Sequence, residues 1–358
     1  MLPANCSLPA PLPYRIIMLM SHFISFPIYA MALYVLFRHH AKSFQTYKCF
    51  LMGHTVLNVL SEVYMSFLYL PMTYLPYPVM RATGLLANWN FSGLFQWYIL
   101  ATFVMLTGVS IIEMFYYRFK VSIIDADRHK FMKILRFGIW SFRAFIAMHT
   151  IFAFVTFSYT IEIIGAAKQD FMAKSPEAPL EILCYTSIFA VTTSWIQQTT
   201  LAMYTSMLMI AVVITPSSVY YIMRFLLSCN LSAATVRMQK MFIISLTFQA
   251  LVHGGMIAAP VVGAVMGILS LLPFDESSYI LILILNFHGF CSTCTMIVFT
   301  KPLRDKFLNS LCRTSITAII APSKTVSVVL ETKLPDAANR SKTLAARRSL
   351  LQQKKCVQ

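Results

Sequence analysis

Charged residues are scarce in this chain of 358 residues. They make up only 12% of it, and Asp and Glu together number 13, whereas soluble globular proteins are about 25% charged. So few polar groups could not cover the surface of a soluble domain, which excludes most soluble folds. Because 58% of the residues are hydrophobic, the composition also excludes disorder of the whole chain, which requires low hydrophobicity.

Catalytic and cofactor motifs are missing as well. Neither HExxH nor GxSxG occurs, and the scattered His and Glu residues lack the spacing of metal ligands. No lysine lies in the interior of an apolar stretch, which argues against a retinal Schiff base. We therefore expect no enzyme, no metal and no cofactor.

The sequence does contain long apolar stretches. A bilayer core of about 30 Å requires about 20 apolar residues in a helix, and seven stretches are long enough. The pattern predicts an all-α fold, a bundle of seven transmembrane helices. The predicted spans cover residues 14–37, 47–70, 92–117, 134–159, 183–227, 241–272 and 278–300.

Four segments follow from these spans. Residues 1–13 would form an outer N-terminal tail, and 14–300 the transmembrane domain. Residues 301–312 are predicted to form a short amphipathic helix on the membrane surface. Residues 313–358, rich in Ser, Thr, Ala, Lys and Arg, predict a disordered basic cytoplasmic tail.

The positive charges lie mainly on one side of the predicted bundle. The net charge is +16, which on a soluble protein would suggest a nucleic-acid partner. However, 24 of the 29 Lys and Arg residues lie on the side of the predicted bundle that holds the C-terminus, and four lie on the side that holds the N-terminus. Positive residues stay cytoplasmic, so the N-terminus is predicted outside. The basicity therefore indicates contact with the inner leaflet of a lipid membrane, and no nucleic acid.

Two cysteines fall on the oxidising outer side. A disulfide between Cys6 and Cys184 would tie the N-terminal tail to the second outer loop or the top of the fifth helix. The alternative is two free or membrane-buried thiols, since sequence supplies no geometry. Asn5 begins an Asn-Cys-Ser pattern and is a candidate glycosylation site in the outer tail.

Polar residues inside the predicted spans are costly in lipid and are therefore functional candidates. Asn58 and Glu62 are four residues apart and share a helix face. The alternative to a chemical role is that such residues satisfy one another inside the bundle and hold the helices in register. The predicted intramembrane network comprises Asn58, Glu62, Glu113, Asn286 and His288.

Several motifs appear in the order that a known family has them. The stretches are Lys48-Cys-Phe-Leu-Met-Gly-His54 with Leu60-Ser-Glu62 and Tyr69-Leu-Pro71, Ile112-Glu-Met-Phe-Tyr-Tyr-Arg118-Phe119, Leu231-Ser-Ala-Ala-Thr235 with Phe248-Gln249 and Ala259-Pro260, His288-Gly-Phe-Cys-Ser-Thr293, and Lys301-Pro-Leu-Arg304. Together they resemble the nematode serpentine receptors of class H, which are chemosensory G-protein-coupled receptors. The acid that precedes the family's Asn-Arg is missing before Arg118, and Leu303 replaces a tyrosine.

The resemblance implies a receptor in the plasma membrane of a sensory cell. A small chemical would bind between the outer halves of the helices and favour a state that a heterotrimeric G protein recognises on the inner face. The ligand-binding candidates are Gln96, Trp97, Trp195, Gln198, His253 and Tyr279, although Trp97, Trp195 and Tyr279 could equally be interfacial anchors. The candidates facing the G protein are Arg118, Lys120, Arg237, Lys240 and Arg304, for which attraction to the membrane surface is the alternative.

A second class of function stays open from the sequence. A transporter or a ligand-gated channel with seven spans would have a similar composition. We find no internal repeat of the kind that transporters often show.

Overall fold

The computed structural model describes most of the transmembrane region and its outer cap. The residues described are 6, 9–38, 45–122, 130–189, 195–228, 232–269, 274–301 and 303–308. Asn5, the candidate glycosylation site, and the predicted tail 313–358 lie outside them.

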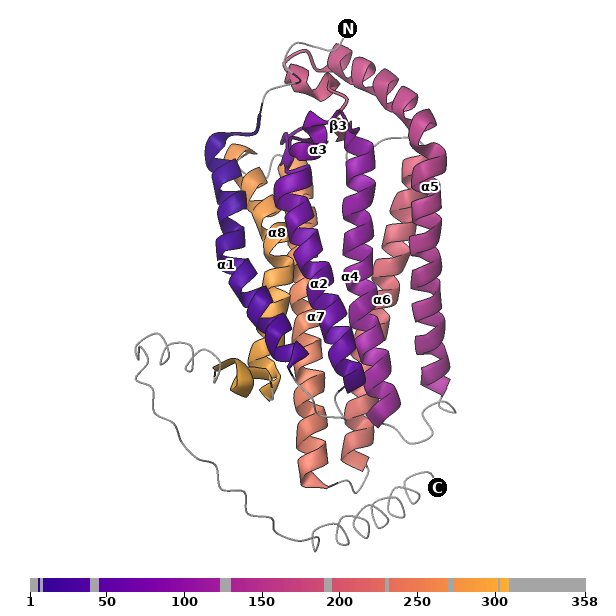
Figure 1. The fold of residues 1–358 in the computed structure, drawn as a ribbon. Helices are drawn as coiled ribbons and strands as arrows, with labels where there is room; N and C mark the ends of the chain where they lie inside the picture. The colour runs from indigo at the N-terminus through magenta and orange to yellow at the C-terminus, as the bar shows by residue number, and fades with distance from the viewer. Residues whose placement is uncertain are drawn as a thin grey trace, which may run out of the picture.

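Seven long helices run side by side in the described part of the chain (Figure 1). They are α1 (Leu12–Phe37), α2 (Gln45–Val63), α4 (Gly93–Ser122), α5 (Lys130–Lys174), α6 (Trp195–Ser228), α7 (Ala233–Ile268) and α8 (Phe274–Phe299). Helix α2 continues as a π-helix, η3 (Tyr64–Tyr69). Helix α4 contacts α2, α5, α6 and α7, and α7 packs along α8. The predicted all-α bundle of seven helices is confirmed.

The bundle has an apolar outer surface, and polar side chains lie buried among the hydrophobic clusters of its interior. Phe23, Phe137 and Leu227 are each more than 70% exposed, whereas Asn58 and Asn286 are completely buried. Helices satisfy their own backbone hydrogen bonds, which a segment in hydrocarbon must do. Among the described residues, five helices are long and apolar enough to cross a bilayer: Leu12–Phe37, Gly93–Ser122, Met209–Leu227, Thr235–Ile268 and Ser278–Phe299.

A small antiparallel sheet covers the outer end of the bundle (Figure 1). Its strands are β1 (Pro71–Thr73), β2 (Val79–Ala82) and β3 (Ser187–Phe189), in the order β1-β2-β3. Two short helical segments accompany it, α3 (Leu85–Asn88) and η5 (Leu180–Leu183). The sheet joins the two long outer connections, because β3 pairs with β2 across more than 100 residues of sequence.

Two predicted boundaries on the outer side are wrong. The fourth predicted span ends at residue 159, which leaves 160–182 as an outer connection, but α5 continues to Lys174. Its 45 residues span about 68 Å, far more than a bilayer core. The extension bends over the outer end of the bundle (Figure 1). Good helix formers and an ion pair between Asp170 and Lys174, four residues apart, favour the continued helix.

The predicted fifth span, residues 183–227, is also too long. The chain forms β3 before α6 begins at Trp195. A short apolar run cannot be assigned to a strand or a helix from its composition alone. Ser187–Phe189 forms a strand because the edge of β2 offers it backbone hydrogen-bond partners.

The inner end of the bundle carries the start of the predicted amphipathic segment. Lys301 and residues 303–308 are helical. Leu303 is 2% exposed and packs in one cluster with Val35 of α1 and Ile297 of α8, whereas Arg304 is exposed. The segment thus has an apolar side against the bundle and a charged side away from it.

Candidate functional site

Three of the predicted ligand-binding residues lie at the outer half of the bundle, on α4 and α8. Trp97 and Tyr279 pack against the same hydrophobic cluster, which contains Tyr14 of α1. The Tyr14 and Tyr279 ring centroids are 4.9 Å apart. Gln96 is completely buried, and its amide nitrogen donates to the Phe91 carbonyl at 3.0 Å. Its Oε1 has no hydrogen-bond partner among the described residues, so one buried acceptor is left unpaired there.

The other three predicted residues do not join this cluster. His253 of α7 lies with His288 of α8, their ring centroids 5.2 Å apart. Gln198 is exposed on α6. Trp195 is the first residue of α6, and its side chain is not among those described. The sequence identified polar and aromatic residues of the outer half, but not which of them share a cluster.

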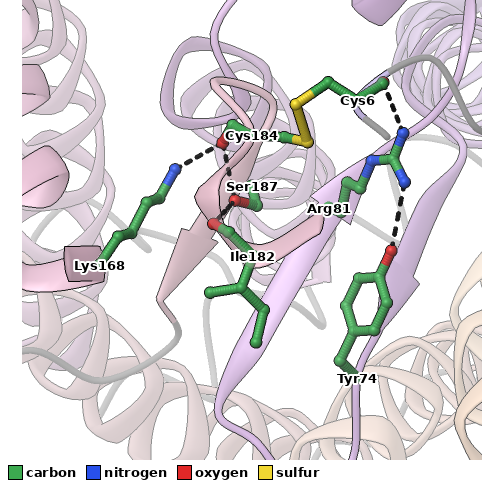
Figure 2. Close-up of a disulfide and its surroundings, with 7 residues drawn as sticks. All are labelled: Cys6, Tyr74, Arg81, Lys168, Ile182, Cys184 and Ser187. Carbon is green, nitrogen blue, oxygen red and sulfur yellow. Dashed lines mark hydrogen bonds between the residues drawn. A yellow bond between two sulfur atoms is a disulfide. The ribbon is translucent and has the colours of Figure 1, made fainter. Parts of the chain in front are cut away.

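A disulfide joins Cys6 to Cys184 beside the outer sheet (Figure 2). The bond closes a sequence separation of 178 residues and links the N-terminal segment to the connection before β3. Cys184 lies in the outer loop, not in a helix. The bridge thus fixes the cap over the end of the bundle.

The backbone carbonyl of each bridged cysteine accepts a hydrogen bond from a buried, positively charged side chain (Figure 2). Arg81 of β2 donates to the Cys6 carbonyl at 2.7 Å and to the Tyr74 hydroxyl at 3.3 Å. Lys168 of α5 donates to the Cys184 carbonyl at 2.6 Å. Burial lowers the pKa of the Lys168 amine to about 8, because desolvation disfavours its charged form. Arg81 and Lys168 were missed by sequence reasoning, although they are two of only four basic residues on the outer side.

The Glu62 carboxylate lies in a cluster of hydroxyl groups at the interface of α1 and α2. It accepts hydrogen bonds from the hydroxyls of Ser25 and Tyr29, the latter at 2.8 Å. His22 Nδ1 is 3.5 Å from the same carboxylate. Glu62 is 1% exposed, and such satisfied polar clusters hold helices in register.

Two of the other predicted network residues link α8 to α1 and α2. Asn286 donates to the Ser21 hydroxyl at 3.1 Å. Asn58 donates to the Gly289 carbonyl at 3.4 Å. Asn58, Glu62, Asn286 and His288 are thus all buried on α2 and α8.

Glu113 does not belong to this network. Its carboxylate accepts hydrogen bonds from Arg143 of α5, from Nε at 3.1 Å and also from Nη2. The reason is its position on α4, which turns the side chain toward α5 and the bundle surface. Glu113 and Arg143 form a partly exposed pair on a face that meets lipid.

Histidines from three helices approach one another in the middle of the bundle. His54 of α2 shares hydrogen bonds with Ser110 of α4 at 2.7 Å and with Ser292 of α8 at 3.1 Å. His253 Nδ1 and His288 Nε2 have no hydrogen-bond partner among the described residues. In the same part of the chain, no three His, Cys, Asp or Glu side chains are arranged to hold a metal ion.

Arg118 is not on the inner surface, where it was predicted to face a G protein. It is 4% exposed, and its guanidinium carbon lies 3.5 Å from the ring centroid of Tyr47 and 3.6 Å from that of Phe242. The guanidinium is planar and weakly hydrated, so two aromatic rings can enclose it. The two rings meet edge to face, with an interplanar angle of 71°, so the guanidinium lies in the corner between them and links α2, α4 and α7 at the inner end.

The remaining basic candidates do lie toward the inner side. Lys120, Arg237 and Arg304 are exposed, and Lys240 is half-buried. Arg304 donates to the Val298 carbonyl at 3.3 Å, which caps the end of α8. These four side chains leave a positive inner face around the buried Arg118.

Comparison with known families identifies the bundle. The family model described as serpentine type 7TM GPCR chemoreceptor Srh matches residues 10–313. No curated protein and no solved structure matches the chain. The match covers most of the chain and the whole bundle, which makes the chain a multi-pass membrane protein. This protein therefore belongs to the Srh family of serpentine seven-transmembrane chemoreceptors.

Proposed function

We propose that this protein is a chemosensory receptor that binds a small chemical between the outer halves of its helices and signals to a heterotrimeric G protein. Family membership supports a receptor of this general kind. The cell would be sensory and the membrane its plasma membrane, where the outer cap faces the chemical and the positive inner face meets the G protein.

The outer cluster favours a ligand that is mostly apolar and carries one hydrogen-bond donor. Trp97 and Tyr279 supply an aromatic surface, and pockets for small molecules combine such surfaces with a few polar groups. Gln96 supplies a buried oxygen without a partner among the described residues. A donor on the ligand would satisfy that oxygen and so recover the free energy that its burial costs.

The observation that supports the signalling proposal is the contact of Arg118 with the rings of Tyr47 and Phe242. A cation enclosed by Tyr47 and Phe242 at the inner end keeps α2, α4 and α7 together. A ligand that prefers a state with these helices apart would shift the population toward it. In that state Arg118 would reach the G protein together with Lys120, Arg237, Lys240 and Arg304.

Expression in a cell line tests this function. Cyclic nucleotide, calcium and membrane conductance are read over a panel of volatile and water-soluble chemicals. We expect a second-messenger response to at least one chemical and no current of the receptor's own. A ligand-gated current that persists without any G protein would contradict the receptor and favour a channel, and accumulated substrate would favour a transporter.

Alanine variants then test the binding residues. Gln96→Ala, Trp97→Ala and Tyr279→Ala are each compared with Gln169→Ala, whose side chain is exposed on the outer part of α5. We expect the response to shift to higher ligand concentration in the first set at normal surface expression. An unchanged response in all three would contradict this pocket.

A further inference from the structure

Two buried histidines meet where α7 packs along α8. The ring centroids of His253 and His288 are 5.2 Å apart, and the two residues are 7% and 1% exposed. Each ring has one nitrogen, Nδ1 of His253 and Nε2 of His288, without a hydrogen-bond partner among the described residues. A buried polar atom without a partner costs free energy, so a ligand that binds both nitrogens is favoured here.

The hydrogen bond on the other side of His288 determines what its unpartnered nitrogen can bind. Nδ1 of this ring lies 2.6 Å from the carbonyl oxygen of Leu285. A carbonyl can only accept, so Nδ1 carries the proton, and Nε2 of the neutral imidazole keeps a lone pair. A histidine that binds a metal ion almost always donates its other N–H to a backbone carbonyl or a carboxylate in this way.

The separation of the two rings fits one metal ion between them. In a tetrahedral zinc site each Zn–N bond is about 2.0–2.1 Å long, which places the centroids of two bound imidazoles about 5 Å apart. The observed distance of 5.2 Å agrees with this value. A water molecule that bridged the two nitrogens through hydrogen bonds of about 2.9 Å would hold the centroids roughly 6.5 Å apart. The distance therefore favours a metal ion over a bridging water.

Two oxygen atoms on the same helices add to the set of possible ligands. Gln249 lies one turn before His253 on α7, and its Nε2 donates to Ser245 at 3.1 Å. Its Oε1 has no hydrogen-bond partner among the described residues, and neither has the hydroxyl of Thr293 on α8. Imidazole nitrogens suit zinc, and oxygen ligands or water complete its coordination shell.

The third histidine of this region is not a ligand. Both ring nitrogens of His54 are already hydrogen-bonded, to Ser110 and to Ser292. Because Ser292 is one turn after His288 on α8, His54 instead connects the histidine pair to α2 and α4. A metal ion here would thus be held by two histidines and by oxygen atoms.

A buried carboxylate lies on the neighbouring side of α8. A carbon added at Gly289, the residue after His288, would lie 2.9 Å from the Tyr29 hydroxyl, and this hydroxyl donates to Glu62 at 2.8 Å. An ion bound by neutral ligands keeps its charge, which burial penalises. The negative charge of Glu62 reduces that penalty, because charges interact strongly where the dielectric constant is low.

We propose that His253 and His288 bind a zinc ion that joins α7 to α8, with water or the oxygen atoms of Gln249 and Thr293 in the remaining positions. The spacing of residues in the sequence gives no sign of this site, because its two histidines come from different helices. The bound ion would hold α7 and α8 at the separation seen here, and any state in which they move apart would break a Zn–N bond. The site requires neither an external chemical nor a G protein, so it does not rest on the proposed function.

Zinc binding to the purified full chain tests the site. The protein, free of any affinity tag, is dialysed in detergent against buffered zinc, and the bound zinc is counted per chain. His253→Leu and His288→Leu each remove one ligand at similar side-chain volume. His149→Leu is the matched control, because His149 is also buried but lies against Tyr98. Thermal unfolding with and without zinc shows whether each variant folds.

We expect the wild type and His149→Leu to bind one zinc ion per chain and to melt at a higher temperature when zinc is present. His253→Leu and His288→Leu should each lower the affinity by about 100-fold or more, since even outer partners of a metal ligand are worth about 10–100-fold. A wild type that retains no zinc, or leucine variants that retain as much zinc as the wild type, would overturn the proposal.

Cobalt spectroscopy then identifies the ligand directly. Co²⁺ replaces Zn²⁺ in tetrahedral sites and absorbs visible light there, and a thiolate ligand adds a charge-transfer band in the near ultraviolet. His288→Cys exchanges the imidazole for a thiolate, which also binds zinc. This variant should therefore retain the metal that His288→Leu loses, and its cobalt spectrum should gain the thiolate band. A cobalt spectrum identical to that of the wild type would show that residue 288 does not contact the ion and would overturn the proposal.

Discussion

The guanidinium carbon of Arg118 lies 3.5 Å from the centroid of the Tyr47 ring, inside the inner end of the bundle. A desolvated cation–π contact of this kind is worth about 2 kcal/mol. If the signalling state lacks the contact, the aromatic side chain holds the receptor in its resting state. The same contact offsets part of the cost of burying a charge at a position that is 4% exposed, where Nε and Nη2 of Arg118 have no hydrogen-bond partner among the described residues.

The first prediction concerns this contact. Tyr47→Leu should raise signalling without ligand, because the loss of about 2 kcal/mol shifts a two-state equilibrium about 30-fold. The measurement is second-messenger output at matched surface expression. Phe248→Leu serves as the control, since that ring stacks on Phe299 of α8 instead. Basal output equal to that of the wild type would show that the contact between Arg118 and Tyr47 does not restrain activation.

The apolar stretches of the sequence predicted the seven helices, but not the structure of the chain at the outer end of the bundle. Inside a bilayer each segment must satisfy its own backbone, so a hydrophobic stretch of sufficient length indicates a helix. Outside the membrane, water can satisfy the backbone, so the secondary structure of a segment depends on which other parts of the chain it contacts. The extension of α5 to Lys174 and the pairing of Arg81 with Ser187 in the sheet depend on such tertiary contacts.

Side-chain placement in the candidate site was only partly predictable for a related reason. Charge counting assigned Arg118 to the inner side, but a count cannot indicate that two aromatic rings enclose it. Glu113 was expected in one polar network with Asn58, Glu62, Asn286 and His288, yet its partner is Arg143 of the neighbouring helix. The topology left Cys6 and Cys184 as the cysteines on the oxidising side, whereas their distance of 5.4 Å between Cα atoms comes only from the fold.

The second prediction concerns the disulfide. Cys6→Ser should lower the free energy of unfolding by about 2–5 kcal/mol, because the bond constrains a long loop of the unfolded chain. Thermal unfolding in detergent measures the loss, and a reductant should reproduce it in the wild type. Cys49→Ser, which changes an exposed free thiol, should have little effect. Equal melting temperatures of Cys6→Ser and wild type would contradict a stabilising bridge.

The third prediction concerns Lys168. Burial lowers its pKa from 10.5 to about 8, so between these values the unfolded state binds more protons than the folded state. Stability therefore rises with pH across this window, and below about pH 8 the buried charge destabilises the cap. Relative to Lys168→Met, the wild type should gain up to about 3 kcal/mol between pH 7.5 and 10.5.

The measurement is the difference in melting temperature between the two proteins at each pH, since other groups titrate equally in both. Lys174→Met is the matched control, because Lys174 is exposed and pairs with Asp170 in the same helix. A difference between wild type and Lys168→Met that stays constant with pH would contradict the lowered pKa.

The fourth prediction tests the close approach of α8 to α1 and α2. A side chain carbon at Gly289 would lie 2.8 Å from Cβ of Asn58 and 2.9 Å from the Tyr29 hydroxyl. Gly289→Ala should therefore destabilise the bundle by about 1–3 kcal/mol through overpacking, and it should disturb the hydrogen bond from Tyr29 to Glu62. Gly254→Ala is the control, because a carbon there meets nothing within 4 Å and alanine favours a helix by up to about 1 kcal/mol. The melting temperature should therefore fall in Gly289→Ala and rise in Gly254→Ala. If it rises in both variants, α8 does not approach α1 and α2 closely at Gly289.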